Sequence, residues 1–196
     1  MLKKIFDFFL FSSSFIAFCA ILMVHQSNHL LSLHYHYRPY LAFVFFSTIC
    51  SYNFHWYLTP EMATEQHRIS WTNKHKNLHL AFLATGLAGA GWYSFYFIQH
   101  WPWMAAGVAL TFLYSAPKLS LPPFRQLRKI AIGKTIFLAF VWMYVTTILP
   151  IVFAEKEWQA QDKLFCVSRF FLIYSICIIF DYRDRENDRL EGIRSM

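Results

Sequence analysis

Residues 132–154 read IGKTIFLAFVWMYVTTILPIVFA, and this stretch decides the class of fold. It contains one charged residue, Lys134, near its start. A helix needs about 20 mostly apolar residues to cross the hydrocarbon core of a bilayer, which is roughly 30 Å thick. The stretch is long enough, and it therefore predicts a membrane-spanning helix.

Similar apolar runs recur along the whole chain of 196 residues. Hydrophobic residues make up 57% of the chain and charged residues 15%, whereas a soluble domain has about 25% charged residues. The runs are residues 5–25, 39–58, 78–98, 101–117, 132–154 and 164–181. They predict an all-α fold, a single transmembrane domain over residues 1–196 with about six spanning helices in a polytopic bundle.

The first run follows Lys3 and Lys4, an arrangement that is also typical of a secretory signal peptide. The run is longer than the apolar part of a signal peptide, and no clear small-residue cleavage site precedes His25. We therefore expect this segment to be retained as one helix.

The third and fourth runs are joined by residues 99–103, which read QHWPW. Aromatic residues of this kind sit at membrane–water interfaces, so we expect a turn there and an antiparallel pair of helices. The third run contains Gly86, Gly89 and Gly91. Small residues let membrane helices approach one another closely, and these glycines therefore predict a tight helix–helix contact.

The basic residues predict the orientation of the bundle. Six alternating helices place Arg38, Lys156 and Lys163 on one side, and Arg169 lies within the sixth run. The remaining 14 of the 18 Lys and Arg residues fall on the side of the N-terminus, which the positive-inside rule assigns to the cytoplasm. We therefore expect a multi-pass protein of the inner membrane whose net charge of +7 reflects topology and not nucleic-acid binding. Arg169 is expected to snorkel toward the interface.

The cysteines and histidines give no strong indication of a metal site. The four cysteines lie inside apolar runs without metal-ligand spacing and are expected to behave as small hydrophobic residues. Four histidines form a cluster that is compatible with metal binding but more typical of a wet interfacial loop. They are His25, His29, His34 and His36.

Three carboxylates follow the sixth run at regular spacing. Asp181, Asp184 and Asp188 stand at i, i+3 and i+7, which places them on one face if the helix continues. Like charges so close repel one another unless a cation lies between them. Mg²⁺ commonly bridges carboxylates to phosphate oxygens, so the run suggests a diphosphate site. The alternative is a solvated helix end whose aspartates pair with neighbouring arginines.

Complementary positive charge lies in the segment from Tyr114 to Lys134, which also contains Lys118 and Arg125. Such cations are able to hold an anionic ligand. Basic residues are also common in any cytoplasmic loop. The segment therefore favours an anion site only in combination with the aspartates.

Together these features resemble the UbiA-type superfamily of intramembrane prenyltransferases. The sequence FDYRDRENDRLEGIRS, residues 180–195, matches the spacing of the family's second aspartate-rich motif, D-x-x-D-x-x-x-D. The sequence LYSAPK, residues 113–118, resembles the opening of the family's fourth loop. Residues 52–61, YNFHWYLTPE, occupy the place of the first motif, N-x-x-x-D-x-x-x-D.

The resemblance implies Mg²⁺-dependent transfer of a prenyl group from a polyprenyl diphosphate to an aromatic or other acceptor that the sequence does not identify. It implies that the aspartates of the second motif hold Mg²⁺, with Asn53 and Glu61 as ligands on the opposite side. It further implies that substrate is bound by Asn53, Arg68, Tyr114, Lys118 and Arg125. Aromatic faces would stabilise an allylic cation, although rings in such a chain more often pack or face lipid. The candidates are Trp142, Tyr144, Phe171 and Tyr174.

Two departures from the family keep an alternative open. Tyr57 stands where the first motif has its central aspartate, and a neutral phenol is a poor ligand for Mg²⁺. Family members have nine helices, and this chain supplies about six, so we expect either a truncated copy or a partner subunit that completes the bundle. The alternative is a catalytically inactive, prenyltransferase-like membrane scaffold. A small transporter is less favoured, because no broken helix pair or inverted repeat is evident.

Overall fold

The computed structural model describes residues 2–58, 67–115 and 131–190, with side chains at 67–69, 131–134, 181 and 183–190 left undescribed. Every regular element in these ranges is a helix, which confirms the all-α prediction. In chain order the helices are α1 (Leu2–Phe11), α2 (Ser14–Leu30), α3 (Tyr37–Tyr57), α4 (His67–Lys74), α5 (Lys76–Ser94), the 3₁₀ helix η1 (Phe95–His100), α6 (Trp101–Ser115), α7 (Ala131–Met143), the π-helical turn η5 (Tyr144–Ile148), α8 (Leu149–Phe153) and α9 (Ala160–Leu190).

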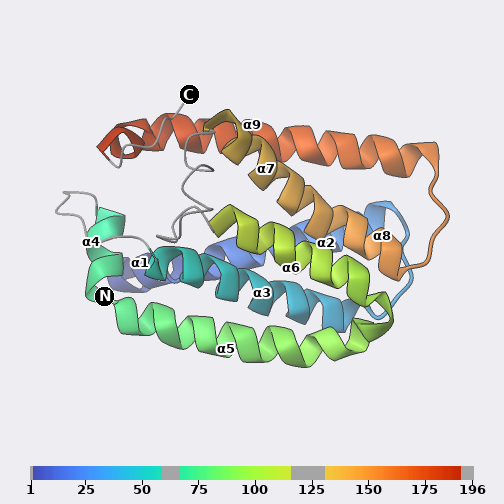
Figure 1. The fold of residues 1–196 in the computed structure, drawn as a ribbon, viewed down its shortest axis with the longest axis horizontal. Helices are drawn as coiled ribbons and strands as arrows, with labels where there is room; N and C mark the ends of the chain where they lie inside the picture. The colour runs from blue at the N-terminus through green and yellow to red at the C-terminus, as the bar shows by residue number, and fades with distance from the viewer. Residues whose placement is uncertain (1, 59–66, 116–130, 191–196) are drawn as a thin grey trace.

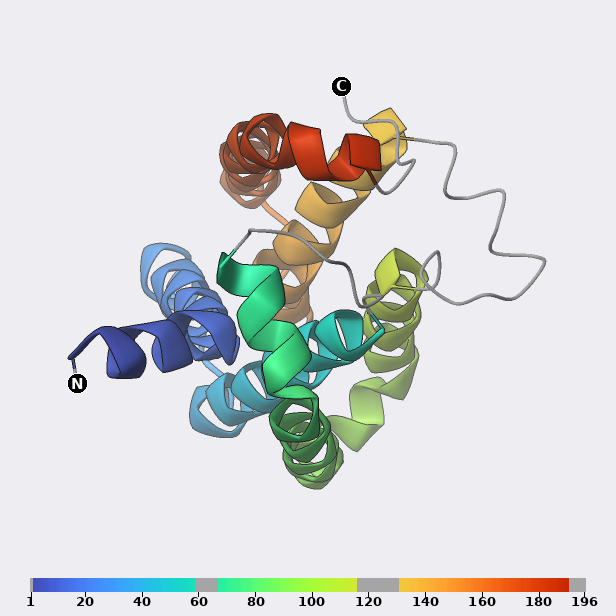
Figure 2. The ribbon, with the colours of Figure 1, turned by 90° about the vertical axis from the view of Figure 1, so that its left-hand side faces the viewer.

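The long helices lie side by side and reverse direction from one to the next (Figure 1). At one end of the bundle α3, α6 and α9 end and α5 and α7 begin, and Figure 2 looks onto this end. We call it the carboxylate end, because it carries residues 181–188 of α9. The opposite end, formed by residues 31–36, η1 and residues 154–159, is called the aromatic end.

Two helical stretches in the described part of the chain are long and apolar enough to cross a membrane. They are Thr135–Phe153, which runs from α7 through α8, and Ala160–Phe180 of α9. The pair α1 and α2 makes a third if the two are counted as one bent span. These stretches support the prediction of a membrane protein.

The first apolar run is not the single helix that the sequence predicts. The helix breaks between α1 and α2, which are bent by 60°. Ser13 takes a left-handed backbone conformation at the break, with φ of 69°, and Ser12 Oγ lies 2.8 Å from Ser14 Oγ. Serine side chains compete for backbone hydrogen bonds and so weaken helices, and three consecutive serines explain why the helix stops here.

Helix α5 packs along α3, and two of the three predicted glycines form the contact. A Cβ atom on Gly86 would lie 2.7 Å from the backbone nitrogen of Cys50, and one on Gly89 would overlap the ring of Phe46. Gly91 meets open space, so the prediction is wrong for that glycine. The chain reverses direction at η1, as expected. Helix α6 packs mainly against α3 and α7, whereas α5 packs mainly against α3.

The π-helical turn η5 lies directly before the turn that contains Pro150, which has no backbone N–H. Leu149 donates its N–H to the Tyr144 carbonyl five residues earlier, and the Val145 carbonyl would need the missing N–H of Pro150. The Tyr40 hydroxyl donates to that carbonyl instead, at 2.6 Å. Tyr40 is fully buried, so this bond joins α3 to η5 in the middle of the core.

Candidate functional site

Helix α9 continues without a break from its apolar part into the aspartate run. The helix ends at Leu190, and the apolar stretch ends at Phe180, immediately before Asp181. Asp184 and Asp188 therefore follow at helical spacing, as the second motif requires. The side chains of the three aspartates lie outside the described residues, so their use as Mg²⁺ ligands stays a prediction.

Asn53 is used for helix packing in this structure. Its side chain is fully buried, and its Nδ2 donates to the carbonyls of Ile49, at 2.8 Å, and Ser12, at 3.2 Å. Its Oδ1 lies 2.6 Å from Nδ1 of His79 on α5. The amide oxygen that a first-motif metal would need accepts a hydrogen bond from His79 in this arrangement, and the use of Asn53 as a Mg²⁺ ligand stays a prediction.

His79 is a buried polar residue that the sequence reasoning missed. Since Asn53 Nδ2 is the donor to two carbonyls, Oδ1 is the acceptor and His79 carries its proton on Nδ1. The Trp71 ring of α4 packs edge-on against His79 at 5.7 Å. One signal was present in the sequence: His79 and Gly86 are seven residues apart on one helix and so share the face that meets α3.

A small cavity near the carboxylate end brings together two predicted residues, Tyr114 and Trp142. Its volume is about 40 Å³, and it lies among α3, α6 and α7. The Tyr114 ring stacks on His55 at 5.5 Å, and Trp142 Nε1 donates to the Tyr52 hydroxyl at 3.2 Å. The buried Ser115 hydroxyl, which also lines the cavity, has no hydrogen-bond partner among the described residues. A water molecule occupies about 30 Å³ of liquid, so the cavity has room for water but not for a ring.

The other aromatic candidates lie apart from this cavity. Tyr144 is buried and donates its hydroxyl to the Trp103 carbonyl at 2.9 Å, which is a packing role. Phe171 is exposed on α9, and Tyr174 stacks on Phe170 at 6.0 Å. Only Trp142 of these candidates lies beside Tyr114.

Arg169 is buried inside the bundle, so the expectation that it snorkels is wrong. Its side chain is 4% exposed, and Nη2 donates to the Ser27 hydroxyl of α2 at 3.3 Å. The guanidinium also lies 5.1 Å from the centre of the Phe165 ring. The Ser27 hydroxyl also lies 3.3 Å from the Thr147 hydroxyl. The Arg169 side chain therefore points toward a pair of polar groups inside the bundle.

The remaining predicted residues are not placed by the structure. Glu61, Lys118 and Arg125 lie outside the described residues, and Arg68 lies in α4 with its side chain undescribed. In the described part of the chain, no group of three or more His, Cys, Asp or Glu side chains is arranged to hold a metal ion. Of the clustered histidines, His25 and His29 are exposed on α2, and His34 and His36 lie by a cavity at the aromatic end.

Comparison with protein-family models, curated proteins and solved structures finds no match to this chain. The resemblance to the UbiA-type superfamily therefore stays a prediction from its motifs.

Proposed function

We propose that this chain is a multi-pass inner-membrane prenyltransferase of the UbiA type, with its carboxylate end in the cytoplasm. The observation that carries the proposal is the unbroken course of α9, which runs from an apolar stretch directly into the aspartate run. A diphosphate head group bound there would lie at the membrane surface, with its prenyl chain in the bilayer.

The arrangement of basic residues supports the same orientation. Lys3 and Lys4 lie on α1, and Lys74 and Lys76 lie where α4 ends and α5 begins, all at the carboxylate end (Figure 1). Cytoplasmic membrane surfaces are enriched in such residues. This end would therefore face both the prenyl diphosphate and the Mg²⁺ of the cell.

The proposed reaction breaks the bond between C1 of the prenyl chain and the diphosphate oxygen. The diphosphate leaves with the electron pair, the acceptor forms a bond to C1, and the acceptor loses a proton. When bound, Mg²⁺ neutralises the charge that develops on the leaving group. Asp181, Asp184 and Asp188 would hold it, and the Tyr114 and Trp142 rings would lie beside the small cavity among α3, α6 and α7.

A second candidate is a scaffold that keeps the fold without turnover, and the bonds of Asn53 favour it. Asn53 is bound to His79, and Tyr57, one turn further along α3, stands where the first motif has its central aspartate, so the first motif would be a weak metal site. A protein of this kind would still bind a prenyl diphosphate through α9, but it would release no diphosphate.

The test is binding of a prenyl diphosphate to the detergent-purified chain with and without Mg²⁺. We expect Asp181→Ala and Asp184→Ala each to weaken the Mg²⁺-dependent binding more than about tenfold, because each removes a charged ligand. Glu157→Ala, an exposed carboxylate at the aromatic end, serves as the control and should bind as the wild type does.

Unchanged binding in both aspartate variants would contradict the metal site on α9. Release of diphosphate on addition of acceptors separates the two candidates: turnover supports the transferase, and binding without turnover supports the scaffold.

A further inference from the structure

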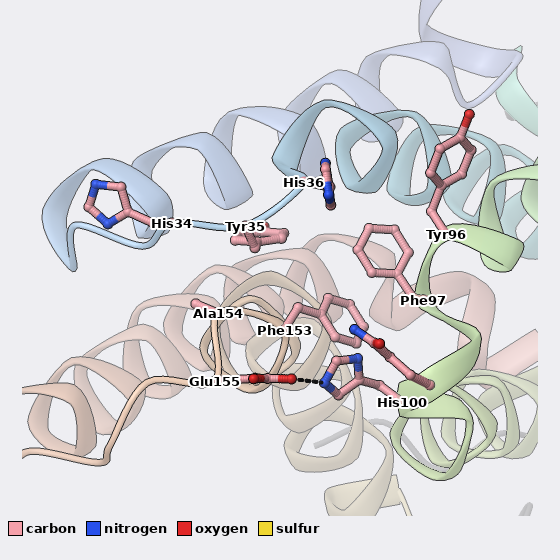
Figure 3. A pocket seen from close by; sticks show the side chains of 10 residues that line it. His34, Tyr35, His36, Tyr96, Phe97, His100, Phe153, Ala154 and Glu155 are labelled. Carbon is pink, nitrogen blue, oxygen red and sulfur yellow. Dashed lines mark ion pairs between the residues drawn. The ribbon is translucent and has the colours of Figure 1, made fainter.

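A second, larger cavity lies at the aromatic end of the bundle, opposite the aspartate run. Its volume is about 250 Å³, and it is formed where residues 34–36, η1 and the end of α8 meet (Figure 3). An apolar cavity of about 150 Å³ takes up a molecule as large as benzene, so this one has room for a small ligand group. Neither the metal site nor the prenyl chain of the proposed reaction uses it.

Aromatic rings form the wall of this cavity. Phe97 stacks on Phe153 at 4.6 Å, and Tyr35 packs against Phe153 at 6.3 Å (Figure 3). Burial raises the pKa of Tyr35 above its usual range, although its hydrogen bond to Asn28 acts the other way, so the phenol is neutral at physiological pH. Neutral ring faces carry negative electrostatic potential and attract cations.

Glu155 supplies the negative charge at the rim. One of its carboxylate oxygens lies 3.4 Å from Nε2 of His100, and the side chain is 74% exposed. The neighbouring Lys156 does not neutralise it, because Lys156 Nζ lies 2.7 Å from Asp162 and 3.2 Å from the Leu31 carbonyl. Within the described part of the chain, Glu155 makes no ion pair with Lys or Arg.

The backbone of Glu155 is also strained. Its φ is 49°, in the left-handed region that costs a residue with a side chain roughly 1–2 kcal/mol. Glycine is the usual residue at a left-handed position that follows a helix. After α8 this position is occupied by Glu155.

The position of the cavity at the aromatic end of the bundle indicates which kind of ligand is able to reach it. Exposed tyrosines and tryptophans surround this end, and such rings lie at the depth of the lipid headgroups. They are Tyr37, Tyr96, Trp101, Trp103 and Trp158. Headgroups are therefore the molecules present at high concentration at its mouth.

We propose that this cavity binds the ammonium group of a zwitterionic phospholipid, with phosphatidylethanolamine as the chemical type. Glu155 is the counter-ion, held in place by His100. The partly exposed Tyr35 ring receives the cation, and the nearly buried rings of Phe97 and Phe153 form the apolar wall beside it. His36 lies across the cavity from Glu155 (Figure 3), where a ring N–H would meet the lipid phosphate. The proposal requires only that the chain lies in a membrane, and it does not depend on prenyl transfer.

The test is binding of short-chain phosphatidylethanolamine to the detergent-purified full chain, with phosphatidylglycerol of the same acyl chains as the comparison lipid. We expect the wild type to prefer phosphatidylethanolamine. Glu155→Gln should weaken its binding about fivefold, in keeping with the loss of one partly exposed charge pair. Glu157→Gln, which removes an exposed carboxylate two residues away, should bind as the wild type does.

Charge reversal sharpens the test, since Glu155→Lys should invert the preference and favour phosphatidylglycerol. Circular dichroism and gel filtration establish that each variant is folded, which the exposure of Glu155 leads us to expect. Equal binding of both lipids by the wild type, or equal effects of the substitutions at residues 155 and 157, would overturn the proposal. Prenyl diphosphate binding by the same samples reports separately on the aspartate run.

Discussion

The contact between α3 and α5 differs in composition and burial from the outer surface of α9. Along α3 and α5, glycines let the backbones meet, and Asn53 bonds to His79 in the contact. Helix α9 buries one face, with Cys166, Ile173 and Cys177 at i, i+7 and i+11, and leaves most of its apolar side chains exposed.

The difference follows from the solvent. Lipid chains are as apolar as leucine, so an apolar face gains little by leaving lipid, and small or polar residues decide where membrane helices pack. Of the apolar stretches that qualify as spans, 56% of Thr135–Phe153 and 22% of Ala160–Phe180 is buried. Helices α3 and α5, which carry the polar and small residues, do not qualify alone. Hydropathy alone therefore does not separate a packed span from an exposed one, since Thr135–Phe153 is the more apolar of the two and also the more buried.

The largest effect is expected from Gly86→Ala, which would break the close contact. Its methyl group would lie 2.7–2.9 Å from backbone atoms of α3, which cannot move without separating the helices. Overpacking of this kind costs about 3 kcal/mol, measured as the free energy of unfolding in mixed detergent micelles. Gly91→Ala meets open space and should stabilise the helix by about 0.5 kcal/mol. Equal effects at both positions would contradict the close approach.

A smaller loss is expected from Asn53→Ala, which removes the polar link between the helices. The buried His79 Nδ1–H loses its acceptor, at a cost of about 1–2 kcal/mol in unfolding free energy. Asn77→Ala, at an exposed position of α5, is the matched control. The loss should be the same with and without Mg²⁺, and a loss that appears only with Mg²⁺ would show that Asn53 is a metal ligand after all.

The smallest effect is expected on the exposed face of α9. Ile179 is 66% exposed, so Ile179→Ala should change the unfolding free energy by less than about 0.5 kcal/mol. Ile173, 5% exposed, packs against Ala139 of α7, and Ile173→Ala should cost about 2 kcal/mol. A large loss at Ile179 in the purified chain would mean that this face packs against protein and not lipid.

Much of the helical layout could be predicted from apolar runs, because each of the six runs is mostly helical in its described part. The break at Ser13 was missed, since hydropathy averages over the three serines that cause it. Gly86 and Gly89 were predicted as contacts, and Gly91 was not distinguished from them, because spacing on a helix does not say how wide the contact is. The Glu155 cavity had no sequence signal, as its walls come from three segments far apart in the chain.

The sequence by itself determined that the chain is helical and contains stretches able to cross a membrane, and that α9 carries three aspartates at helical spacing. These properties are local, since they depend on hydrogen bonds four residues apart and on the polarity of consecutive side chains. Only the tertiary structure decided that Asn53 bonds to His79, that Arg169 turns inward to Ser27 and that Glu155 stands at a ring-lined cavity. Each of these depends on which helix faces meet, and that is settled by the packing of helices distant in sequence.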